Sequence, residues 1–372
     1  MRVLLTAVPA LGHVVPLLDL AGALRSGGHE VRFATNVERH QVIGDAGVDA
    51  VSAGMSMAEM VAERRRRWPD TVGQPATVWG TRMWAQVMAP SMLDDLVAIV
   101  GDWLPDVVIH DEGDYAAPVA AAVAEIPCIT HGWGSPLRPD SELVELQDLT
   151  AAMWSSCGLD VPFAGGLYAH ALVNPCPPIL QDVASGAAVV WPLRPRSLRG
   201  HGIRVRADDY VGFGTVPGFA NAPDELDSAV RACASLGMRV VVTAPDPELR
   251  RRLESIDPEL VTAHEFVSLP QLVASCRVVI THAGAGTVLV ALTEGVPVVV
   301  VPRGSPSQTR MAEACHRAGV GRRCDATTLA STLDDVLNDP SISAAASAAA
   351  AQIASKPPAT EVVPRIEALA HA

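Results

Sequence analysis

A turn at residues 282–287, His-Ala-Gly-Ala-Gly-Thr, has the residue types that hold an anion without a metal ion. It follows an apolar run rich in Val and Ile and precedes a stretch of helical composition. Gly284 and Gly286 let the backbone turn sharply, so that several N–H groups meet at the start of the helix, whose dipole also favours negative charge. The His282 ring and the Thr287 hydroxyl can each add a hydrogen bond. The pattern predicts a phosphate site within a βαβ unit.

Two common phosphate motifs do not fit this turn. It is not a P-loop, and it fails the dinucleotide-binding fingerprint because no third glycine follows its two glycines at the required offset. A nucleotide diphosphate held by a helix N-terminus and one histidine is the interpretation that remains.

Three carboxylates, Asp111, Glu112 and Asp114, follow a strand predicted at residues 106–110. Such a cluster can bind a divalent metal, but its spacing matches no common all-protein site, and similar clusters often only cap loops. Pairing of one carboxylate with His13 is the simpler hypothesis, because it fixes the histidine tautomer and supports the imidazolium that forms when the ring accepts a proton. A loop histidine that only caps a helix stays open as an alternative. A serine hydrolase has less support, because no Gly-x-Ser-x-Gly motif occurs.

Alternating strands and helices must position these groups, and they predict an α/β fold. The elements expected in the first half are strands at 2–7, 29–35, 106–110 and 127–131 and helices at 14–26, 94–100, 115–125 and 136–160. Those expected in the second half are strands beginning at 209 and at 238–243, 265–269, 277–281 and 297–301 and helices at 223–236 and 287–294. His13 then ends the loop after the first strand, and ligands sit at the carboxyl ends of parallel strands.

The chain length of 372 residues exceeds what one hydrophobic core usually serves, so we predict two domains. The N-terminal domain is expected at 1–190, a Pro-rich linker at 191–208 and the C-terminal domain at 209–355. The remaining residues, 356–372, are expected to form a helix that packs back on the N-terminal domain.

Bulk composition narrows the class of ligand and the compartment. The formal net charge of −13 argues against a nucleic-acid partner, which needs a basic face. The seven cysteines lack Cys-x-x-Cys or Cys/His spacing, so neither a disulfide framework nor zinc is indicated. No apolar run approaches membrane-spanning length, and the apolar N-terminus is too short for a signal sequence. We predict a cytoplasmic protein with small-molecule ligands and no membrane partner, and a homodimer is a further prediction.

Aromatic and methionine side chains gather in the first half of the chain. Trp68, Trp79, Met83 and Trp84 lie close in sequence, and Trp133 falls just past a predicted strand end. Adaptable apolar side chains of this kind suit a pocket for a hydrophobic ligand, although ordinary core is an equally open interpretation.

Together these residues make the chain resemble the inverting, nucleotide-sugar-dependent glycosyltransferases of the GT-B fold, in the bacterial branch that decorates polyketides and related antibiotics. The stretch GHVVPLLDLAGALRSGGHEV at 12–31 resembles the N-terminal signature of that family, and HAGAGTVLVALTEGVPVVVVP at 282–302 resembles its C-terminal donor signature. The resemblance implies two Rossmann-like domains facing each other across a cleft. It also implies an acceptor on the first domain, a nucleotide sugar on the second and no metal or other cofactor.

The resemblance also implies roles for individual residues. His13 would be the general base that deprotonates an acceptor hydroxyl, with Asp111 as its orienting partner. The implied donor site consists of Thr215, Val267, Ser268, His282, Gly284, Ala285, Gly286, Thr287, Ser307 and Gln308. The acceptor is expected at Trp68, Trp79, Met83, Trp84 and Trp133.

The chain departs from the family at the sugar-binding positions. After Pro302 the family usually has an Asp-Gln pair and then an asparagine, whereas this chain has Ser307, Gln308 and Met311. Loss of a charge-assisted contact should weaken recognition of a fully hydroxylated hexose by roughly 1.5 to 3 kcal/mol. We therefore predict a deoxysugar donor carried on TDP. The family's tryptophan before the donor signature is Phe266 here.

Two alternatives to sugar transfer remain open from the sequence. One is a sugar-nucleotide epimerase or hydrolase on the same fold, which product mass would distinguish from a transferase. The other is a non-catalytic homologue that activates a partner glycosyltransferase. The intact His13 and the turn at 282–287 count against the non-catalytic homologue, while Ser307 counts for it.

Overall fold

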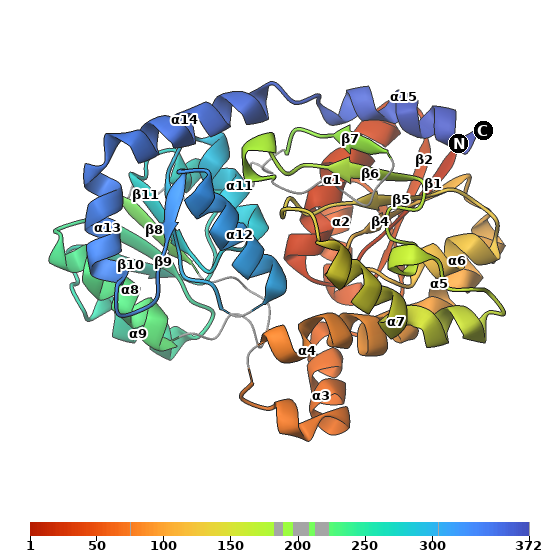
Figure 1. Cartoon of the computed structure of the whole chain (residues 1–372), viewed down its shortest axis with the longest axis horizontal. Helices are drawn as coiled ribbons and strands as arrows, with labels where there is room; N and C mark the ends of the chain where they lie inside the picture. The colour runs from red at the N-terminus through yellow and green to blue at the C-terminus, as the bar shows by residue number, and fades with distance from the viewer. Residues whose placement is uncertain (75, 182–188, 196–207, 213–222, 304, 372) are drawn as a thin grey trace. The chain divides into compact units, whose positions relative to one another are not determined.

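The computed structural model of this chain describes residues 1–74, 76–181, 189–195, 208–212, 223–303 and 305–371. It contains two parallel β-sheets with flanking helices, which confirms the predicted α/β class (Figure 1). The chain divides into two compact units. Unit 1 comprises Met1–Cys176, Val183–Arg196 and Lys356–Ala372, and unit 2 comprises Pro177–Asp182 and Ser197–Ser355.

The sheet of unit 1 has the strand order β3-β2-β1-β4-β5-β6-β7, with every neighbouring pair parallel. Its strands are β1 (Arg2–Thr6), β2 (Glu30–Thr35), β3 (Asp49–Ser52), β4 (Val107–Asp111), β5 (Cys128–His131), β6 (Ala171–Asn174) and β7 (Val190–Pro192). The central strands are apolar runs because helices cover both faces of such sheets. The carboxyl ends of β1, β4 and β5 therefore meet at one edge.

Helices α1 and α15 pack together on the sheet of unit 1 and share one hydrophobic cluster with its strands (Figure 1). The helices of unit 1 are α1 (Leu11–Ser26), α2 (His40–Asp45), α3 (Met57–Arg67), α4 (Ala76–Met83), α5 (Ala89–Trp103), α6 (Ala117–Val123), α7 (Asp140–Ser156) and α15 (Ala359–Ala370). A π-helical turn, Trp84–Met88, joins α4 to α5.

The last segment of the chain completes unit 1. Val362, Val363 and Ile366 of α15 lie in the same buried cluster as residues of α1. Just before α15, the ammonium group of Lys356, the only lysine, donates to the backbone oxygens of Asn174 at 2.9 Å and Cys176 at 2.6 Å. Burial lowers the pKa of this ammonium to about 8. The return of the chain to unit 1 is therefore fixed by buried apolar contacts and by one cation.

The predicted boundaries need correction at the end of the N-terminal domain. The linker expected at 191–208 begins inside β7, because that strand pairs with β6. Residues Pro177–Asp182, expected in the first domain, group with unit 2. Residues 196–207 of the expected linker lie outside the described residues.

Unit 2 has a sheet of order β10-β9-β8-β11-β12-β13, again all parallel. Its strands are β8 (Asp209–Gly212), β9 (Val240–Thr243), β10 (Val261–His264), β11 (Val278–Thr281), β12 (Val298–Val300) and β13 (Gly321–Arg323). Its helices are α8 (Pro223–Ser235), α9 (Pro247–Glu254), α10 (Leu269–Val273), α11 (Ala285–Thr293), α12 (Pro306–Arg317), α13 (Leu329–Asn338) and α14 (Pro340–Ala354). The strand expected at 265–269 lies earlier, as β10.

One continuous helical run among the described residues, Val78–Trp103, meets the length and composition criterion for a membrane span, with a mean hydropathy of 1.2. It does so because the π-helical turn joins α4 and α5 into one run. Half of its most apolar window is buried, and Met83, Met88 and Leu96 lie in the core. A core helix is buried in the same way, so this run is only weak evidence for a membrane-spanning helix.

Asp209, at the start of β8, gives a pH-dependent prediction for the stability of unit 2. The residue is fully buried, and this burial raises the pKa of its carboxyl to about 7. The pKa in the unfolded chain is near 3.9, so the folded state binds the proton more tightly, and the free energy of unfolding falls as pH rises from about 4 to about 7. Asp209→Asn should therefore gain stability over the wild type across this window, by at most about 4 kcal/mol above pH 7. Urea unfolding at several pH values measures this difference.

The neighbouring Asp208 supplies a control of opposite sign. Its pKa is lowered mainly by the backbone N–H of Arg239, which donates to it at 3.0 Å. Asp208→Asn should lose stability at neutral pH, and that loss should vanish as pH falls below the unfolded-state pKa. Equal pH profiles for the two variants would contradict the assignment to Asp209.

Candidate active site

His13 lies in the first turn of α1, not at the end of a loop as expected. The helix begins at Leu11 after Ala10, whose backbone is extended, and so includes the residues predicted as loop. This start places the His13 side chain at the carboxyl edge of the sheet, where 17% of it is exposed.

His13 and Asp111 form the predicted pair. The His13 Nδ1 atom lies 2.8 Å from Asp111 Oδ2, and the Asp111 side chain is fully buried. Asp111 ends β4, which pairs in parallel with β1, so the strand before α1 and the strand that carries the carboxylate are neighbours. The carboxylate favours a proton on Nδ1 and leaves Nε2 as the acceptor. This arrangement suits a general base.

Gly113 leaves room for this pair. A Cβ atom at this position would lie 2.9 Å from both Cε1 and Nδ1 of His13 and 3.0 Å from Asp111 Oδ2. Only a glycine therefore lets the turn after β4 pass this close to the imidazole.

Gly113→Ala should lower kcat on the order of 10-fold, because the added methyl group displaces the His13 ring by a fraction of an ångström. Initial rates of the sugar transfer that the family resemblance predicts, at saturating substrates, measure this change. Gly101→Ala, in α5, is the matched control, since a Cβ there meets no atom within 4 Å. Equal rates for the two variants would show that the close approach has no catalytic consequence.

Two of the predicted acceptor residues lie against His13. The ring centroid of Trp133 is 4.6 Å from that of His13 in an edge-on arrangement, and the Trp84 centroid is 5.5 Å away. Both indoles are partly exposed. Trp84 opens the π-helical turn, a distortion often found at functional sites. Aromatic walls on a histidine base can hold an apolar acceptor next to it.

The structure does not bring the other predicted acceptor residues to His13. Met83 is fully buried, and Trp79 is 5% exposed with the Arg64 guanidinium 4.3 Å from its ring centroid. Trp68 ends α3, with Arg82 4.2 Å from its ring centroid. Burial favours the core interpretation for Met83 and Trp79, whereas Trp68 is partly exposed and packs against the exposed Arg82.

The two carboxylates next to Asp111 have separate partners. Glu112 accepts from Arg138 Nε at 3.1 Å, and Asp114 accepts from the Thr6 hydroxyl and from two backbone N–H groups at the start of α6. Burial raises the pKa of Asp114 to about 6. Within the part of the chain that the structure describes, no group of three or more His, Cys, Asp or Glu side chains is placed to hold a metal ion.

The turn of unit 2 that is predicted to bind an anion lies between β11 and α11. Ala283 has a φ of +69°, and Gly284 caps the helix. A Cβ on Gly284 would lie 2.7 Å from Cε1 and Nε2 of His282, so the imidazole lies directly over this glycine. A Cβ on Gly286 would meet no atom within 4 Å, which leaves space above the helix start. Thr287 is partly exposed in the first turn of α11.

His282 is neutral at physiological pH. Burial lowers the pKa of its imidazole to about 4, and the nearby charge of Arg303 acts in the same direction. A neutral imidazole has one N–H donor, and the ring is already hydrogen-bonded to the backbone of Gly212, so donation to an anion requires that contact to give way.

Four more of the predicted donor residues lie at the same edge of the sheet of unit 2. Ser307 and Gln308 begin α12, after β12, and the Gln308 side chain accepts from the Arg303 backbone N–H at 2.8 Å. Val267 and Ser268 follow β10, and the buried Ser268 hydroxyl has no hydrogen-bond partner among the described residues. Thr215 lies outside the described residues.

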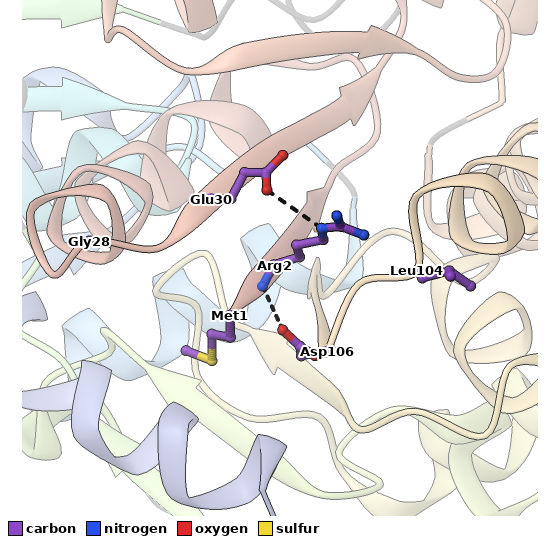
Figure 2. Close-up of a pocket in the computed structure, with 6 residues that line it drawn as sticks. All are labelled: Met1, Arg2, Gly28, Glu30, Leu104 and Asp106. Atoms are coloured by element: carbon purple, nitrogen blue, oxygen red, sulfur yellow. Dashed lines mark hydrogen bonds and ion pairs between the residues drawn. The ribbon is translucent and has the colours of Figure 1, made fainter.

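A hollow at the opposite edge of unit 1 is not part of this site. Figure 2 shows it at the amino ends of β1, β2 and β4, where Arg2 contacts Glu30 and Asp106. His13 lies at the carboxyl edge of the sheet, which is where parallel sheets bind ligands. The hollow lies at the other edge and is therefore not expected to bind the substrates.

Sequence reasoning missed two parts of the site. The need for Gly113 depends on a distance to the His13 ring, and the Glu112–Arg138 pair joins positions 26 residues apart. Neither feature has a local sequence signal. The alternation of strands and Gly-containing turns predicts only the edge of the sheet at which Gly113 and the Glu112–Arg138 pair lie.

Comparison with protein families matches both units. The N-terminal domain of the erythromycin biosynthesis protein CIII-like family matches residues 22–153, and its C-terminal domain matches residues 226–369. Together these matches cover nearly three quarters of the chain.

Curated relatives match over almost the whole chain. Tylactone mycaminosyltransferase of Streptomyces fradiae is 28% identical, over 99% of this chain and 92% of its own length. Erythronolide mycarosyltransferase of Saccharopolyspora erythraea is 27% identical, over 99% of both chains.

Solved structures share the fold. Spinosyn rhamnosyltransferase SpnG superimposes with a TM-score of 0.79 at 25% identity, covering 99% of this chain and 100% of its own. The glycosyltransferase SsfS6 of Streptomyces sp. SF2575 in complex with thymidine diphosphate gives 0.77 at 25% identity and 99% coverage of each chain. The two Rossmann-like units are therefore those of the GT-B fold. This chain belongs to the erythromycin biosynthesis protein CIII-like family and is a bacterial natural-product glycosyltransferase.

Proposed function

We propose that this glycosyltransferase moves a deoxysugar from a TDP-sugar to a hydroxyl group of a hydrophobic aglycone, with inversion at the anomeric carbon. The observation that carries the proposal is the 2.8 Å contact between His13 Nδ1 and Asp111 Oδ2 at the carboxyl edge of unit 1.

In the proposed mechanism, His13 Nε2 takes the proton of the acceptor hydroxyl as that oxygen attacks the anomeric carbon. The bond from that carbon to the diphosphate breaks, and the buried Asp111 stabilises the imidazolium that forms. The backbone amides at the start of α11 and the N–H of His282 donate hydrogen bonds to the departing nucleotide diphosphate and stabilise its negative charge. Every role in these steps is filled by side chains and backbone of this chain.

Four observations support the donor. Ser307 stands where the family usually has an acid, and its hydroxyl lies 3.2 Å from that of Ser305, so the sugar meets neutral groups there. A relative from Streptomyces galilaeus is named a 2-deoxy-L-fucose transferase, and the structure of SsfS6 holds thymidine diphosphate. Phe266, 67% exposed beside Val267 and Ser268, offers a ring on which a base can stack.

A mass-shift screen tests the proposal. The full chain is incubated with TDP-deoxysugars or UDP-glucose and with tylactone, an erythronolide or aklavinone, the acceptor types in the names of relatives. Addition of one deoxysugar to an aglycone is the expected result. A clear preference for UDP-glucose would overturn the deoxysugar assignment. Release of free sugar or an epimerised nucleotide sugar alone would favour the epimerase or hydrolase alternative, which the comparisons do not support.

The proposal includes three features on which the comparisons are silent. Transfer needs no metal ion, so excess EDTA should leave kcat unchanged within about twofold, and loss of activity that Mg²⁺ restores would contradict this. The protein acts in the cytoplasm. It is a homodimer, which light scattering during gel filtration can test.

A further inference from the structure

A buried ion pair adjoins the His13–Asp111 pair without touching a ligand position. Glu112, the residue after Asp111, is 4% exposed, and its Oε1 atom accepts from Arg138 Nε at 3.1 Å. The same oxygen accepts from the Tyr168 hydroxyl at 2.7 Å. Burial raises the pKa of Tyr168 well above its ordinary value, so the phenol remains a donor.

Arg138 also contacts the aromatic wall of the site. Its guanidinium carbon lies 5.7 Å from the ring centroid of Trp133, whose own centroid is 4.6 Å from that of His13. The two segments are joined through backbone as well, because the Glu112 N–H donates to the His131 oxygen at 3.0 Å. One cation is therefore linked through Glu112 to the strand end that carries Asp111, and it directly contacts the indole that packs on His13.

We propose that Arg138 and Glu112 are positioning residues of the transfer reaction, which hold Asp111 and Trp133 where they orient the His13 ring. This inference rests on the proposed role of His13 as the base. A buried ion pair contributes little net stability, because desolvation offsets the attraction, and apolar replacements of both partners are often neutral. A displaced catalytic group, in contrast, costs rate steeply, on the order of 100-fold per ångström. The pair should therefore affect turnover more than folding.

The double variant Arg138→Met/Glu112→Leu removes both buried charges at once. We expect cooperative unfolding to persist and kcat to fall on the order of 10-fold. The KM for the TDP-sugar should stay unchanged, because the donor turn belongs to unit 2. The acid limb of the pH–rate profile should move to lower pH, since Asp111 is no longer held against the imidazolium.

Glu142→Gln is the matched control. It removes the charge of the partly exposed Glu142, whose carboxylate lies 4.0 Å from Arg138 Nη1, and it leaves the Glu112 contacts in place. Its kcat, KM and pH profile should equal those of the wild type. A loss as large as that of the double variant would mean that any change at Arg138 disturbs the fold.

A second readout needs no substrate. In protein labelled with ¹³C-histidine, the His13 Cε1–H signal, assigned with His13→Asn, is sensitive to the ring currents of Trp84 and Trp133. It should move in the double variant and stay in place in Glu142→Gln. If the wild type glycosylates no aglycone, the proposed function fails, while this signal still tests the positioning. An unmoved signal together with wild-type kcat and pH profile overturns the inference.

Tyr168→Phe takes the place of the double variant if that protein does not fold. It removes one hydrogen bond to Glu112 and no charge. A smaller shift of the His13 signal and a severalfold loss of kcat are expected. No change in either would overturn the inference.

Discussion

Replacing His13 with alanine is expected to lower the kcat for sugar transfer by roughly 10²- to 10⁴-fold, the range that a positioned general base contributes. The reason is that Asp111 and the two flanking indoles hold this imidazole, and its loss leaves the buried carboxylate without the ring that takes the acceptor proton. The Kd for TDP should be unchanged, because the donor turn belongs to unit 2. Rates of product formation by mass spectrometry and calorimetric titration with TDP measure the two quantities.

His371→Ala is the matched control, since that histidine is exposed near the end of unit 1. It should transfer sugar at the wild-type rate. Turnover by the His13 variant close to that of this control would show that another group takes the acceptor proton.

Replacing His282 with alanine is expected to raise the Kd for TDP by roughly 10- to 100-fold, which corresponds to the loss of a hydrogen bond to a charged group. In the proposed mechanism the neutral ring, placed over Gly284 at the start of α11, donates to a diphosphate oxygen, and the variant keeps the backbone amides. Calorimetric titration measures the loss. His316→Ala, an exposed histidine in α12, should bind TDP as the wild type does.

The glycines of the turn refine this experiment. Gly284→Ala should weaken TDP binding by displacing the His282 ring, since its Cβ would lie 2.7 Å from that ring. Gly286→Ala meets no protein atom within 4 Å, so a loss of affinity there reports contact with the ligand itself. Undiminished affinity in both variants would place the diphosphate elsewhere.

The sequence predicted the α/β class and the strands with continuous apolar runs, such as β1, β4 and β11. Short edge strands escaped prediction because they carry little apolar signal. β3 begins with the exposed Asp49, and β13 is Gly-Arg-Arg, whose place in the sheet depends on pairing with β12. The order of residues along the chain does not predict which strand pairs with which.

The site was predictable to the extent that it follows strand ends. Asp111 and His282 each come directly at or after a buried strand, so their edge of the sheet followed from the sequence. Trp79 and Met83 could not be separated from Trp84 by composition. The π-helical turn beginning at Trp84 rotates the side chains that follow, and only the folded helix shows that Met83 faces the core.

The position of α15 has a consequence for how the protein is made. Four of its residues, Ala359, Val362, Val363 and Ile366, fill the same core as the first helix. A ribosome adds about 5 to 20 residues per second from the N-terminus, so unit 1 must wait for most of the chain before its core can close. Unit 2 holds no such late segment among its described elements. The domain that carries the base is thus begun first in synthesis and completed last.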